Sequence, residues 1–427
     1  MAEAGWLPSP DMLEREDVSR DLGSLVVSRV GALVESGDPW EPYRLVDPAG
    51  AMVGAAAAYM KDLQAAGRPA TTQRSYGMDL LRWFRFLWAV EVPWNEATRI
   101  EARDFSRWIQ ITAKPPRPHR SSASTSSSAV RPVARGTNPI TGKRPVGTTY
   151  AASTVAHSET VLRSFYAHHL EAGTGPLVNP FPLARTPRVN AHHNPMEPWR
   201  PQRAGLFRPR QPQRIPRQIP DAVFNELFAR LSSDRDRAMV AFWISTGARA
   251  SELLGVLCSG TDPGRQLVTV VRKGSRALQQ LPASPDAFVW LRLYQQQMHE
   301  LVPTGPDDPL WWTLRRPFRA LNYHAARAMF VRANSTLGSD WSLHDLRHTA
   351  AYRLARDPLM PITDVQWVLG HARLSTTQRY VTPTTEDVIE SVLAHHRRQA
   401  EEPAEPSEPT LHYRPESLDV LFGRRRP

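Results

Sequence analysis

The chain contains very little cysteine, very little lysine and no long apolar segment. Its single cysteine, Cys258, excludes an internal disulfide and is typical of a reducing cytoplasm. The apolar stretches around 51–60 and 238–246 are far shorter than the roughly 20 residues that a membrane-spanning helix needs. The first twenty residues mix acidic and apolar positions and do not form a secretory signal. We therefore expect a cytoplasmic protein that does not enter a membrane.

The scarcity of lysine singles out one position. The chain has four lysines against 49 arginines, and Lys273 is the only lysine in the last 284 residues. A guanidinium stays protonated at any working pH, whereas a lysine ammonium can lose its proton. A chain that uses arginine for almost every positive charge has therefore kept one cation that can transfer a proton. This points to proton transfer at Lys273.

The chain is strongly basic. A net charge of +11 and a pI near 10.2 indicate a polyanionic partner, with nucleic acid as the first candidate and an anionic membrane surface as the second. Composition alone does not choose between them. The 427 residues suffice for two or three domains, and 41% hydrophobic residues can fill sizeable cores.

The first half of the chain predicts a helical domain with a basic insertion. Residues 1–48 form an N-terminal extension, in which apolar positions within 22–33 predict one short amphipathic helix. Residues 49–180 carry helical periodicity, strongest over 71–90. Within them, 114–147 holds basic residues and no acid around a serine-rich run. This composition predicts a disordered insertion that can lie along a phosphate backbone.

The second half predicts a linker, a mixed domain and a tail. Residues 181–220 hold nine prolines and eight arginines against one acid, which is typical of an extended connector. Residues 221–400 show helical spacing interrupted by a strand pair at 267–271 and 278–281, with a lysine in the turn between them. Residues 401–427 are first acidic and proline-rich and then end in arginines, so we expect a disordered tail.

Two ligand-binding patterns are present only in part. Residues 136–143 resemble a phosphate-binding loop, but the glycine spacing is one residue too long and Arg144 stands where serine or threonine belongs. His344 and His348 are spaced like zinc ligands on one helix, but the residue after His344 is aspartate, no third ligand is evident, and Arg347 would place a cation beside the metal. We therefore expect neither a metal nor a cofactor.

Separated segments carry the residues that point to chemistry. Arg249 and Glu252 lie one helical turn apart, so the acid can orient the guanidinium, although a structural salt bridge would look the same. His344 and Arg347 lie three apart, and therefore on one face, in a helix that Ser342 begins. This pair alone is weak, because the chain is rich in both residue types.

The segment 369–380 is the sharper signal. Gly370 can end a helix, Ser375 or Thr376 can begin another, and Tyr380 follows His371 by nine residues. A tyrosine at such a position is most often half-buried packing when it is considered alone. Its meaning depends on the other segments.

Together, the four segments resemble the catalytic domain of the tyrosine recombinases, the family of phage integrases and bacterial site-specific recombinases. They are Thr-Gly-Ala-Arg-Ala-Ser-Glu-Leu, Arg-Lys-Gly-Ser-Arg, Leu-His-Asp-Leu-Arg-His-Thr, and Leu-Gly-His followed by the tyrosine. The resemblance covers 221–400 strongly and 49–180 more weakly. It implies a mainly α fold with a small antiparallel β-sheet, in which a helical core-binding domain precedes a mixed α/β catalytic domain.

The resemblance also implies the role of each catalytic residue. Tyr380 would attack the scissile phosphate and form a 3'-phosphotyrosine. Arg249, supported by Glu252, and Arg347 would bind the non-bridging oxygens. His344 would accept or relay the tyrosine proton. His371 would donate a hydrogen bond to the phosphate, and Lys273 would protonate the leaving 5'-oxygen.

Double-stranded DNA is the partner that the resemblance implies, at the nucleoid of a bacterial cytoplasm. The helix expected at 384–398 would couple protomers into a homotetramer on DNA, and an accessory DNA-bending protein or directionality factor would fit the same scheme. A mobile genetic element is one setting for such an enzyme. Basic residues beside the apolar stripe and the catalytic lysine are the DNA-contact candidates: Arg74, Arg82, Arg85, Arg272 and Arg276.

Two alternatives use the same fold. A non-catalytic DNA-binding architectural protein or regulator would not need the reacting side chains, all of which are present. A type IB topoisomerase would relax supercoiled DNA without a specific site, whereas the expected core-binding domain and coupling helix favour recombination. The sequence does not reveal the recognised site, or whether the task is integration, transposition or resolution.

Overall fold

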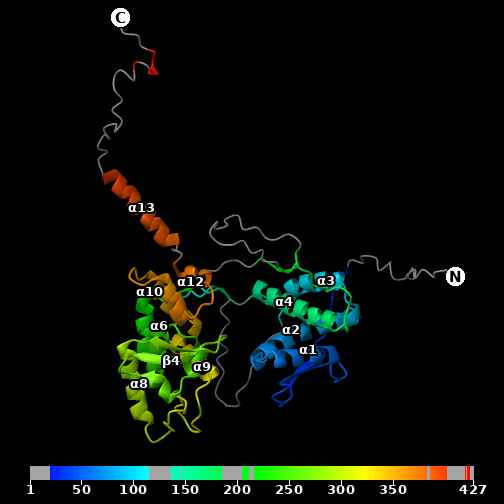
Figure 1. The fold of residues 1–427 in the computed structure, drawn as a ribbon, viewed down its shortest axis with the longest axis horizontal. Helices are drawn as coiled ribbons and strands as arrows, with labels where there is room; N and C mark the ends of the chain where they lie inside the picture. The colour runs from blue at the N-terminus through cyan, green and yellow to red at the C-terminus, as the bar shows by residue number, and fades with distance from the viewer. Residues whose placement is uncertain are drawn as a thin grey trace, which may run out of the picture. The chain divides into compact units, whose positions relative to one another are not determined.

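The computed structural model describes residues 20–114, 136–145, 147–184, 204–210, 216–381, 385–401, 419 and 421–423. The chain divides into two compact units. Unit 1 comprises Met1–Arg135 and Pro145–Gln213, and unit 2 comprises Gly136–Arg144 and Arg214–Pro427. The fold is mainly helical with small antiparallel sheets, as the sequence predicts (Figure 1). Among the described residues, no helix is both long enough and apolar enough to cross a membrane.

Unit 1 is a helical domain with a two-stranded hairpin at its start. An aromatic core holds it together, because Trp83, Phe86, Phe105, Phe165 and Tyr166 are all almost fully buried. The Trp83 indole donates a hydrogen bond of 2.9 Å to the Tyr166 hydroxyl, so these two buried polar groups satisfy each other. Its elements are β1 (Ala32–Glu35), β2 (Tyr43–Val46), α1 (Gly54–Ala65), α2 (Ala70–Ala89), η2 (Trp94–Glu96), α3 (Arg99–Ile111) and α4 (Ala152–Glu171).

The helix expected within 22–33 is absent from the described chain: residues 22–31 form a turn and irregular chain, and strand β1 begins at Ala32. Gly31 and Gly37 both have positive φ, at 66° and 76°, and such residues end or prevent a helix. Leu33 packs closely over Gly77 of α2, where a Cβ atom would lie 2.6 Å from the leucine side chain. Leu33 therefore covers α2 from strand β1.

Unit 2 is built around α6, which packs against α8 and the sheet. The sheet has the order β3-β4-β5 and is antiparallel, and β4 pairs Leu267 with Pro282 and Val271 with Leu278. The predicted strand pair and its turn are thus in place. The elements are α5 (Asp221–Ala229), α6 (Asp234–Thr246), α7 (Ala250–Leu254), η3 (Cys258–Gly260), β3 (Thr261–Asp262), β4 (Leu267–Val271), β5 (Leu278–Pro282), α8 (Pro285–Met298), α9 (Tyr323–Ser335), α10 (Leu343–Arg356), α11 (Ile362–Leu369), α12 (Leu374–Val381) and α13 (Thr385–Glu401).

The segments expected to be an insertion and a linker contain ordered pieces. Residues 136–144 of the expected insertion form hydrogen bonds with unit 2, while its serine-rich run lies outside the described residues. Phe181, at the start of the expected linker, is fully buried in the core of unit 1, and Ile219, near its end, is buried in unit 2. These apolar side chains anchor the ends of a segment that composition alone describes as extended. Most of the expected tail, 401–427, also lies outside the described residues.

Candidate active site

Glu252 is the buried centre of a network that orients two arginines. Helix α6 ends at Gly247, which has a φ of 61°, and Arg249 precedes the first turn of α7. The Glu252 carboxylate accepts hydrogen bonds from Arg249 N (2.9 Å), Arg249 Nη1 (2.8 Å), Arg272 Nη1 (3.1 Å) and Lys273 N (3.0 Å). Burial alone would raise the pKa of Glu252, but the two backbone amides and the Arg249 guanidinium hold it below its ordinary value.

Arg272, expected to contact DNA, lies buried with only 4% of its surface exposed. Its guanidinium donates to Glu252, to Gln279 Oε1 at 2.6 Å and to the backbone carbonyl of Val368. These contacts tie the turn after β4 to the end of α11, and DNA contact stays a prediction for Arg272.

Arg347 is held from both sides by backbone carbonyls. It lies on the buried face of α10 with 3% of its surface exposed. Its Nη1 donates to Gly247 O at 2.6 Å, and its Nη2 donates to Leu369 O at 2.6 Å and to His371 Nε2 at 3.1 Å. Burial and the neighbouring Arg249 charge lower the pKa of Arg347 to about 10, so its guanidinium remains charged at neutral pH.

The contacts of His371 fix its tautomer. Arg347 can only donate, so His371 Nε2 must accept and the ring proton must lie on Nδ1. That proton points to Thr377 Oγ1 at 2.9 Å, and Thr377 is fully buried. Burial, together with the charges of Arg347 and Arg249, lowers the pKa of His371 to about 4, which keeps the ring neutral. In this state His371 orients Arg347, and the donor role expected of it toward a phosphate would require a different protonation state.

Tyr380 contacts His348, which the sequence interpretation considered only as an unlikely zinc ligand. The Tyr380 hydroxyl lies 2.8 Å from His348 Nδ1, and only 5% of the tyrosine is exposed. The Tyr380 ring is also parallel to that of His371, with 10° between the planes and 6.2 Å between centroids. Burial raises the pKa of Tyr380, although the Arg347 charge acts in the opposite direction, so the phenol keeps its proton at neutral pH.

His344 lies one turn before His348 on α10 and is exposed. Its ring meets that of His348 at a centroid distance of 4.2 Å. The surrounding protein and the Arg347 charge lower the pKa of His344. The position of His344 matches the expectation of a histidine at the site, but the ring that touches the tyrosine hydroxyl belongs to His348. A histidine four residues after another on one helix is the sequence signal that could have identified it.

Lys273 lies on the exposed turn between β4 and β5, as predicted. Its backbone amide donates to Glu252 at 3.0 Å, so the same carboxylate fixes the turn and orients Arg249. The side chain extends from this fixed turn. Arg249, the expected catalytic residue that precedes α7, is thereby linked to the lysine turn through one carboxylate.

The other arginines expected at DNA differ from one another. Arg85 donates to the backbone carbonyls of Val30 at 2.7 Å and Gly31 at 2.8 Å, so it fastens α2 to the hairpin segment. Arg82 pairs with Asp79 and is also engaged within unit 1. Both side chains are thus engaged within unit 1, and DNA contact stays a prediction for them. Arg74 and Arg276 are exposed, and DNA contact remains a prediction for them.

The site is cationic. In the described part of the chain, no group of three or more His, Cys, Asp or Glu side chains is placed to hold a metal ion. Three arginines, Arg249, Arg272 and Arg347, converge with a single carboxylate. A mainly helical unit with a three-stranded sheet, a buried arginine in contact with His371 and a buried tyrosine in contact with His348 is similar to the arrangement expected of the tyrosine recombinase class.

Comparison with known proteins gives the same class. Residues 219–387 match the model of the phage integrase family. The tyrosine recombinase XerD of Yersinia pestis is 28% identical over 201 residues, which cover 45% of this chain and 66% of the relative. XerC of Corynebacterium glutamicum is 31% identical over 165 residues, with 38% and 52% covered. The match therefore spans about half to two thirds of the relatives' length, and residues 219–387 are similar to the tyrosine recombinase, or phage integrase, family.

Solved structures share the fold. The Tn1549 transposon integrase in complex with circular intermediate DNA has a TM-score of 0.51 at 13% identity, and the alignment covers 79% of this chain and 98% of that one. The XerH recombinase bound to palindromic difH substrate has a TM-score of 0.51 at 16% identity, with 82% and 85% covered. At such low identity these neighbours show the fold alone.

Proposed function

We propose that this protein is a site-specific DNA recombinase that cleaves and rejoins strands through a 3'-phosphotyrosine intermediate. The observation that carries the proposal is the gathering of Arg249, Arg347 and His371 around Tyr380. Arg347 contacts His371, whose ring stacks on that of Tyr380, and the charges of both arginines act on the Tyr380 side chain. These residues come from segments up to 131 positions apart in the sequence. The single side chain of Arg347 nevertheless joins them, because it contacts Gly247 O, Leu369 O and His371 Nε2. Two cationic forks next to a buried phenol suit a phosphodiester whose negative charge grows in the transition state.

The chemistry balances without a cofactor. The Oη atom of Tyr380 forms a bond to phosphorus as the bond from phosphorus to the 5'-oxygen breaks. The phenolic proton passes to a histidine, and Lys273 supplies a proton to the leaving 5'-oxygen. The phosphotyrosine conserves the energy of the broken bond, so a 5'-hydroxyl from another strand can reverse the step without ATP. Arg347 and Arg249 remain charged throughout and hold the non-bridging oxygens.

The DNA would be held by both units. Unit 1 serves as the core-binding domain in this proposal, with Arg74 as a contact, and Arg276 beside Lys273 serves the catalytic unit. The support is the chain's net charge of +11 and the DNA present in the integrase and recombinase structures that share the fold. An accessory DNA-bending protein or directionality factor assists the reaction in this proposal, and recombination takes place at the bacterial nucleoid.

Helix α13 is proposed to join protomers into a tetramer on DNA. Its apolar residues Val388, Ile389, Val392 and Leu393 are each about half exposed, at 44 to 53%. Their spacing of three and four places them on one face of the helix. An apolar face of this kind is suited to a groove on a neighbouring copy.

The test is a covalent adduct with DNA. Duplexes bound by the protein are first selected from a random-sequence pool, and the selected site is then prepared with a nick near the scissile position. We expect a denaturant-resistant protein–DNA complex with the wild type and none with Tyr380→Phe. An adduct formed equally by Tyr380→Phe would refute the nucleophile assignment.

Two further outcomes separate the alternatives. Tight binding without an adduct, for the wild type at any nick position, would favour a non-catalytic DNA-binding protein. Relaxation of supercoiled plasmid lacking the selected site would favour a type IB topoisomerase. Strand exchange between two duplexes that carry the site is the result that the proposed function requires.

A further inference from the structure

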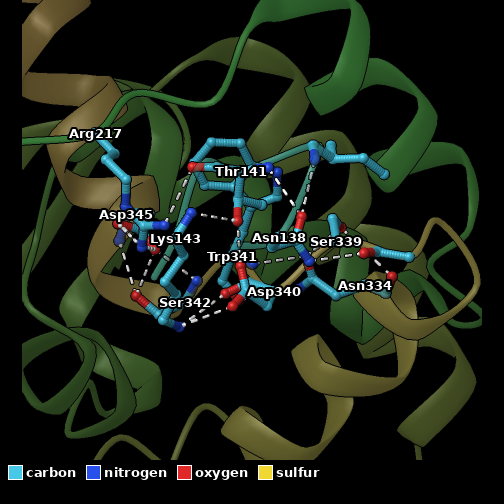
Figure 2. Close-up of polar contacts among 12 residues, drawn as sticks. Asn138, Thr141, Lys143, Arg217, Asn334, Ser339, Asp340, Trp341, Ser342 and Asp345 are labelled. Carbon is cyan, nitrogen blue, oxygen red and sulfur yellow. Dashed lines mark hydrogen bonds and ion pairs between the residues drawn. The ribbon is translucent and has the colours of Figure 1, made fainter. Parts of the chain in front are cut away.

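A short piece of the basic insertion is folded onto the catalytic unit. Residues Gly136–Arg144 belong to unit 2, although the chain on both sides of them belongs to unit 1. The chain therefore reaches unit 2 first through this piece and again at Arg214. Figure 2 shows the polar contacts of the piece with the segment that precedes α10.

The piece has a shape of its own. Asn138 Oδ1 accepts hydrogen bonds from Ile140 N at 2.9 Å and Thr141 N at 3.0 Å. The backbone closes the turn, because Asn138 N donates to Lys143 O and Gly142 N donates to Asn138 O, both at 2.9 Å. Gly142 has a φ of 63°, which a residue with a side chain rarely adopts. We call residues Asn138–Lys143 the docking loop.

Two side chains of the docking loop make its main contacts with unit 2. Asn138 Nδ2 donates to Gly338 O at 2.9 Å, and Thr141 Oγ1 donates to the Asp340 carboxylate. Thr141 is buried, with 6% of its surface exposed. Lys143 also approaches Asp340, but both side chains are 40% exposed, so this ion pair adds little.

The receiving segment is held together by hydrogen bonds and leads directly into α10. The buried Asn334 side chain accepts from Ser339 Oγ at 2.7 Å and Trp341 N at 3.1 Å, and donates to Trp341 O at 3.2 Å. Ser342 then begins α10, and Asp345 accepts hydrogen bonds of 2.8 Å from both the backbone amide and the hydroxyl of Ser342. The fold of this turn therefore sets where α10 starts.

Arg217 connects the docking loop with the cap of α10 (Figure 2). Its guanidinium donates to Thr141 O at 3.4 Å and to Asp345 Oδ2 at 3.2 Å. It also lies over the Trp341 ring, 5.4 Å from the centroid. The loop and the helix cap thus share one cation.

We propose that the docking loop is a positioning element for α10, the helix that carries His344, Arg347 and His348. By binding Gly338 and Asp340, it fixes the turn from which the helix begins. The catalytic consequence rests on the proposed function. Displacements of about 1 Å in a reacting group can slow a reaction by about a hundredfold, so loss of docking should slow cleavage more than it weakens DNA binding.

Two paired substitutions test the docking loop. Asn138→Asp keeps the Oδ1 acceptor that shapes the loop but replaces the Nδ2 donor to Gly338 with an oxygen. Thr141→Val removes the hydroxyl that binds Asp340, and Thr141→Ser restores it. Thr137→Ala, at an exposed position next to the loop, is the matched control.

Two measurements are made on each full-length variant. Hydrogen exchange is followed in peptides spanning 334–346, and adduct formation is timed with nicked duplex at saturating protein. We expect Asn138→Asp and Thr141→Val to exchange faster in that region and to cleave at least about tenfold more slowly, with DNA binding within about twofold. Thr141→Ser and Thr137→Ala should match the wild type.

Normal exchange over 334–346 in Asn138→Asp and Thr141→Val would overturn the proposal, and so would faster exchange with an unchanged rate of cleavage. Failure of the wild type to form any adduct would refute the proposed function instead. The exchange comparison would still decide whether the docking loop fixes the start of α10.

A separate observation concerns the proton of Tyr380. His348 Nδ1 lies 2.8 Å from the Tyr380 hydroxyl, and His344 is exposed on the preceding turn. Burial and the neighbouring His344 ring lower the pKa of His348 to about 4, so the imidazole is neutral and can accept a proton at neutral pH. Burial raises the pKa of Tyr380, so its hydroxyl needs an acceptor when it attacks.

The geometry points to His348 as the catalytic base that receives this proton, a role that rests on the proposed function. As Tyr380 Oη bonds to phosphorus, its proton moves to His348 Nδ1, and the bond to the 5'-oxygen breaks as Lys273 protonates that oxygen. In the reverse step the His348 imidazolium returns the proton to the phenol. His344, in ring contact with His348, then acts through it as a positioning residue.

Substitutions at His348 separate proton transfer from orientation. His348→Phe keeps a ring and removes both nitrogens, whereas His348→Asn keeps a polar group near the Nδ1 position but has no basic nitrogen. Tyr352→Phe is the control, because Tyr352 follows on the same helix face and its buried hydroxyl has no hydrogen-bond partner in the described structure. The measurement is the rate of adduct formation against pH.

Both His348 variants should form the adduct about 10² to 10⁴ times more slowly near neutral pH, and their rates should rise steeply toward alkaline pH as hydroxide replaces the base. The wild type and Tyr352→Phe should lack this steep rise. A wild-type profile in His348→Phe would overturn the role of base. So would a wild-type rate in His348→Asn, since that result would leave His348 only an orienting role. Absence of any wild-type adduct would instead count against the proposed function.

Discussion

Replacement of Glu252 should uncouple the two arginines and the lysine turn in one step. The side chain is 1% exposed and receives four hydrogen bonds, two from guanidinium groups and two from backbone amides. Glu252→Gln keeps the shape of the side chain but removes its charge. The new NH₂ group also faces groups that can only donate, namely the arginine guanidinium groups and the backbone amides. Arg272, whose side chain is 5% exposed, then lies buried without its anion.

The expected loss of stability follows from that burial. Removal of one partner of a buried ion pair costs about 3 to 5 kcal/mol, because the other charge remains desolvated. Arg249 is 29% exposed and can turn toward water, so Arg272 accounts for most of the loss. We therefore expect the free energy of unfolding of unit 2 to fall by about 3 kcal/mol, and cleavage to be abolished in the folded fraction.

The assay is urea unfolding followed by hydrogen exchange in peptides of unit 2, which separates this unit from unit 1. Glu226→Gln in α5 is the control, because Glu226 is exposed and its loss should change stability by less than about 0.5 kcal/mol. Glu252→Gln combined with Arg272→Met should recover part of the loss, since no buried charge is then left alone. A stability within about 0.5 kcal/mol of the wild type for Glu252→Gln would refute the reasoning.

The same network predicts the sign of a pH effect. The pKa of Glu252 is lower in the folded protein than its ordinary value of 4.5. The stabilisation from its charge is therefore complete above that value and is lost as the pH falls through the lower, folded pKa. The stability difference between the wild type and Glu252→Gln should shrink only in acid, and a difference that shrank toward alkaline pH would contradict the assignment.

Three further predictions follow from the site. Lys273→Arg should bind DNA normally but cleave it about 10² to 10⁴ times more slowly. A duplex with sulfur in place of the bridging 5'-oxygen should restore the rate, because its leaving group needs no proton. Normal cleavage of the oxygen substrate by Lys273→Arg would exclude the role of Lys273 as the acid. Thr377→Val should slow adduct formation about tenfold by removing the acceptor of His371 Nδ1, and an unchanged rate would show that the tautomer is unimportant. Ile389→Asp on α13 should still form the adduct on a single site but should reduce strand exchange, and the size of the protein–DNA complex is measured alongside. Glu390→Gln, at an exposed position, should not reduce strand exchange. Tetramers of normal size in Ile389→Asp would exclude α13 as the coupling element.

Local sequence patterns predicted the elements that depend on neighbouring residues. The alternating apolar residues of 267–271 and the lysine turn after them are a strand and turn of the three-stranded sheet. Ser342 caps α10 through its side chain, and Gly370 ends α11 with a φ of 60°, as residues of these types were expected to do. Each of these outcomes is determined within a few residues of chain.

The contacts that the sequence did not predict join distant segments. Arg272 reaches the carbonyl of Val368, 96 residues later, so its burial depends on the packing of α11. His348 meets Tyr380 across 32 residues, and Asn138 meets Gly338 across 200. The basic composition around Asn138 predicted disorder because composition averages over a segment. The docking loop instead depends on the side chains of Asn138 and Thr141 and on the turn of unit 2 that they contact.

The arginines of the site all donate hydrogen bonds to backbone carbonyls at helix ends. These partners explain how the cluster of arginines keeps a net positive charge. Arg347 donates to Gly247 O at the end of α6 and to Leu369 O at the end of α11. Arg272 donates to Val368 O, and Arg249 to Gly370 O at 3.4 Å, again at the end of α11.

Carbonyls at helix ends lack partners within the helix and carry partial negative charge, so they can satisfy a guanidinium without cancelling it. In the described part of the chain, the carboxylate that forms ion pairs with these arginines is that of Glu252, which pairs with Arg249 and Arg272. If a carboxylate oriented each of the three arginines, the site would be neutral. A neutral site would offset little of the free energy that it costs to desolvate a bound phosphate. Helix ends therefore let the fold bury its arginines and still present a net positive charge to the anion that Tyr380 is proposed to attack.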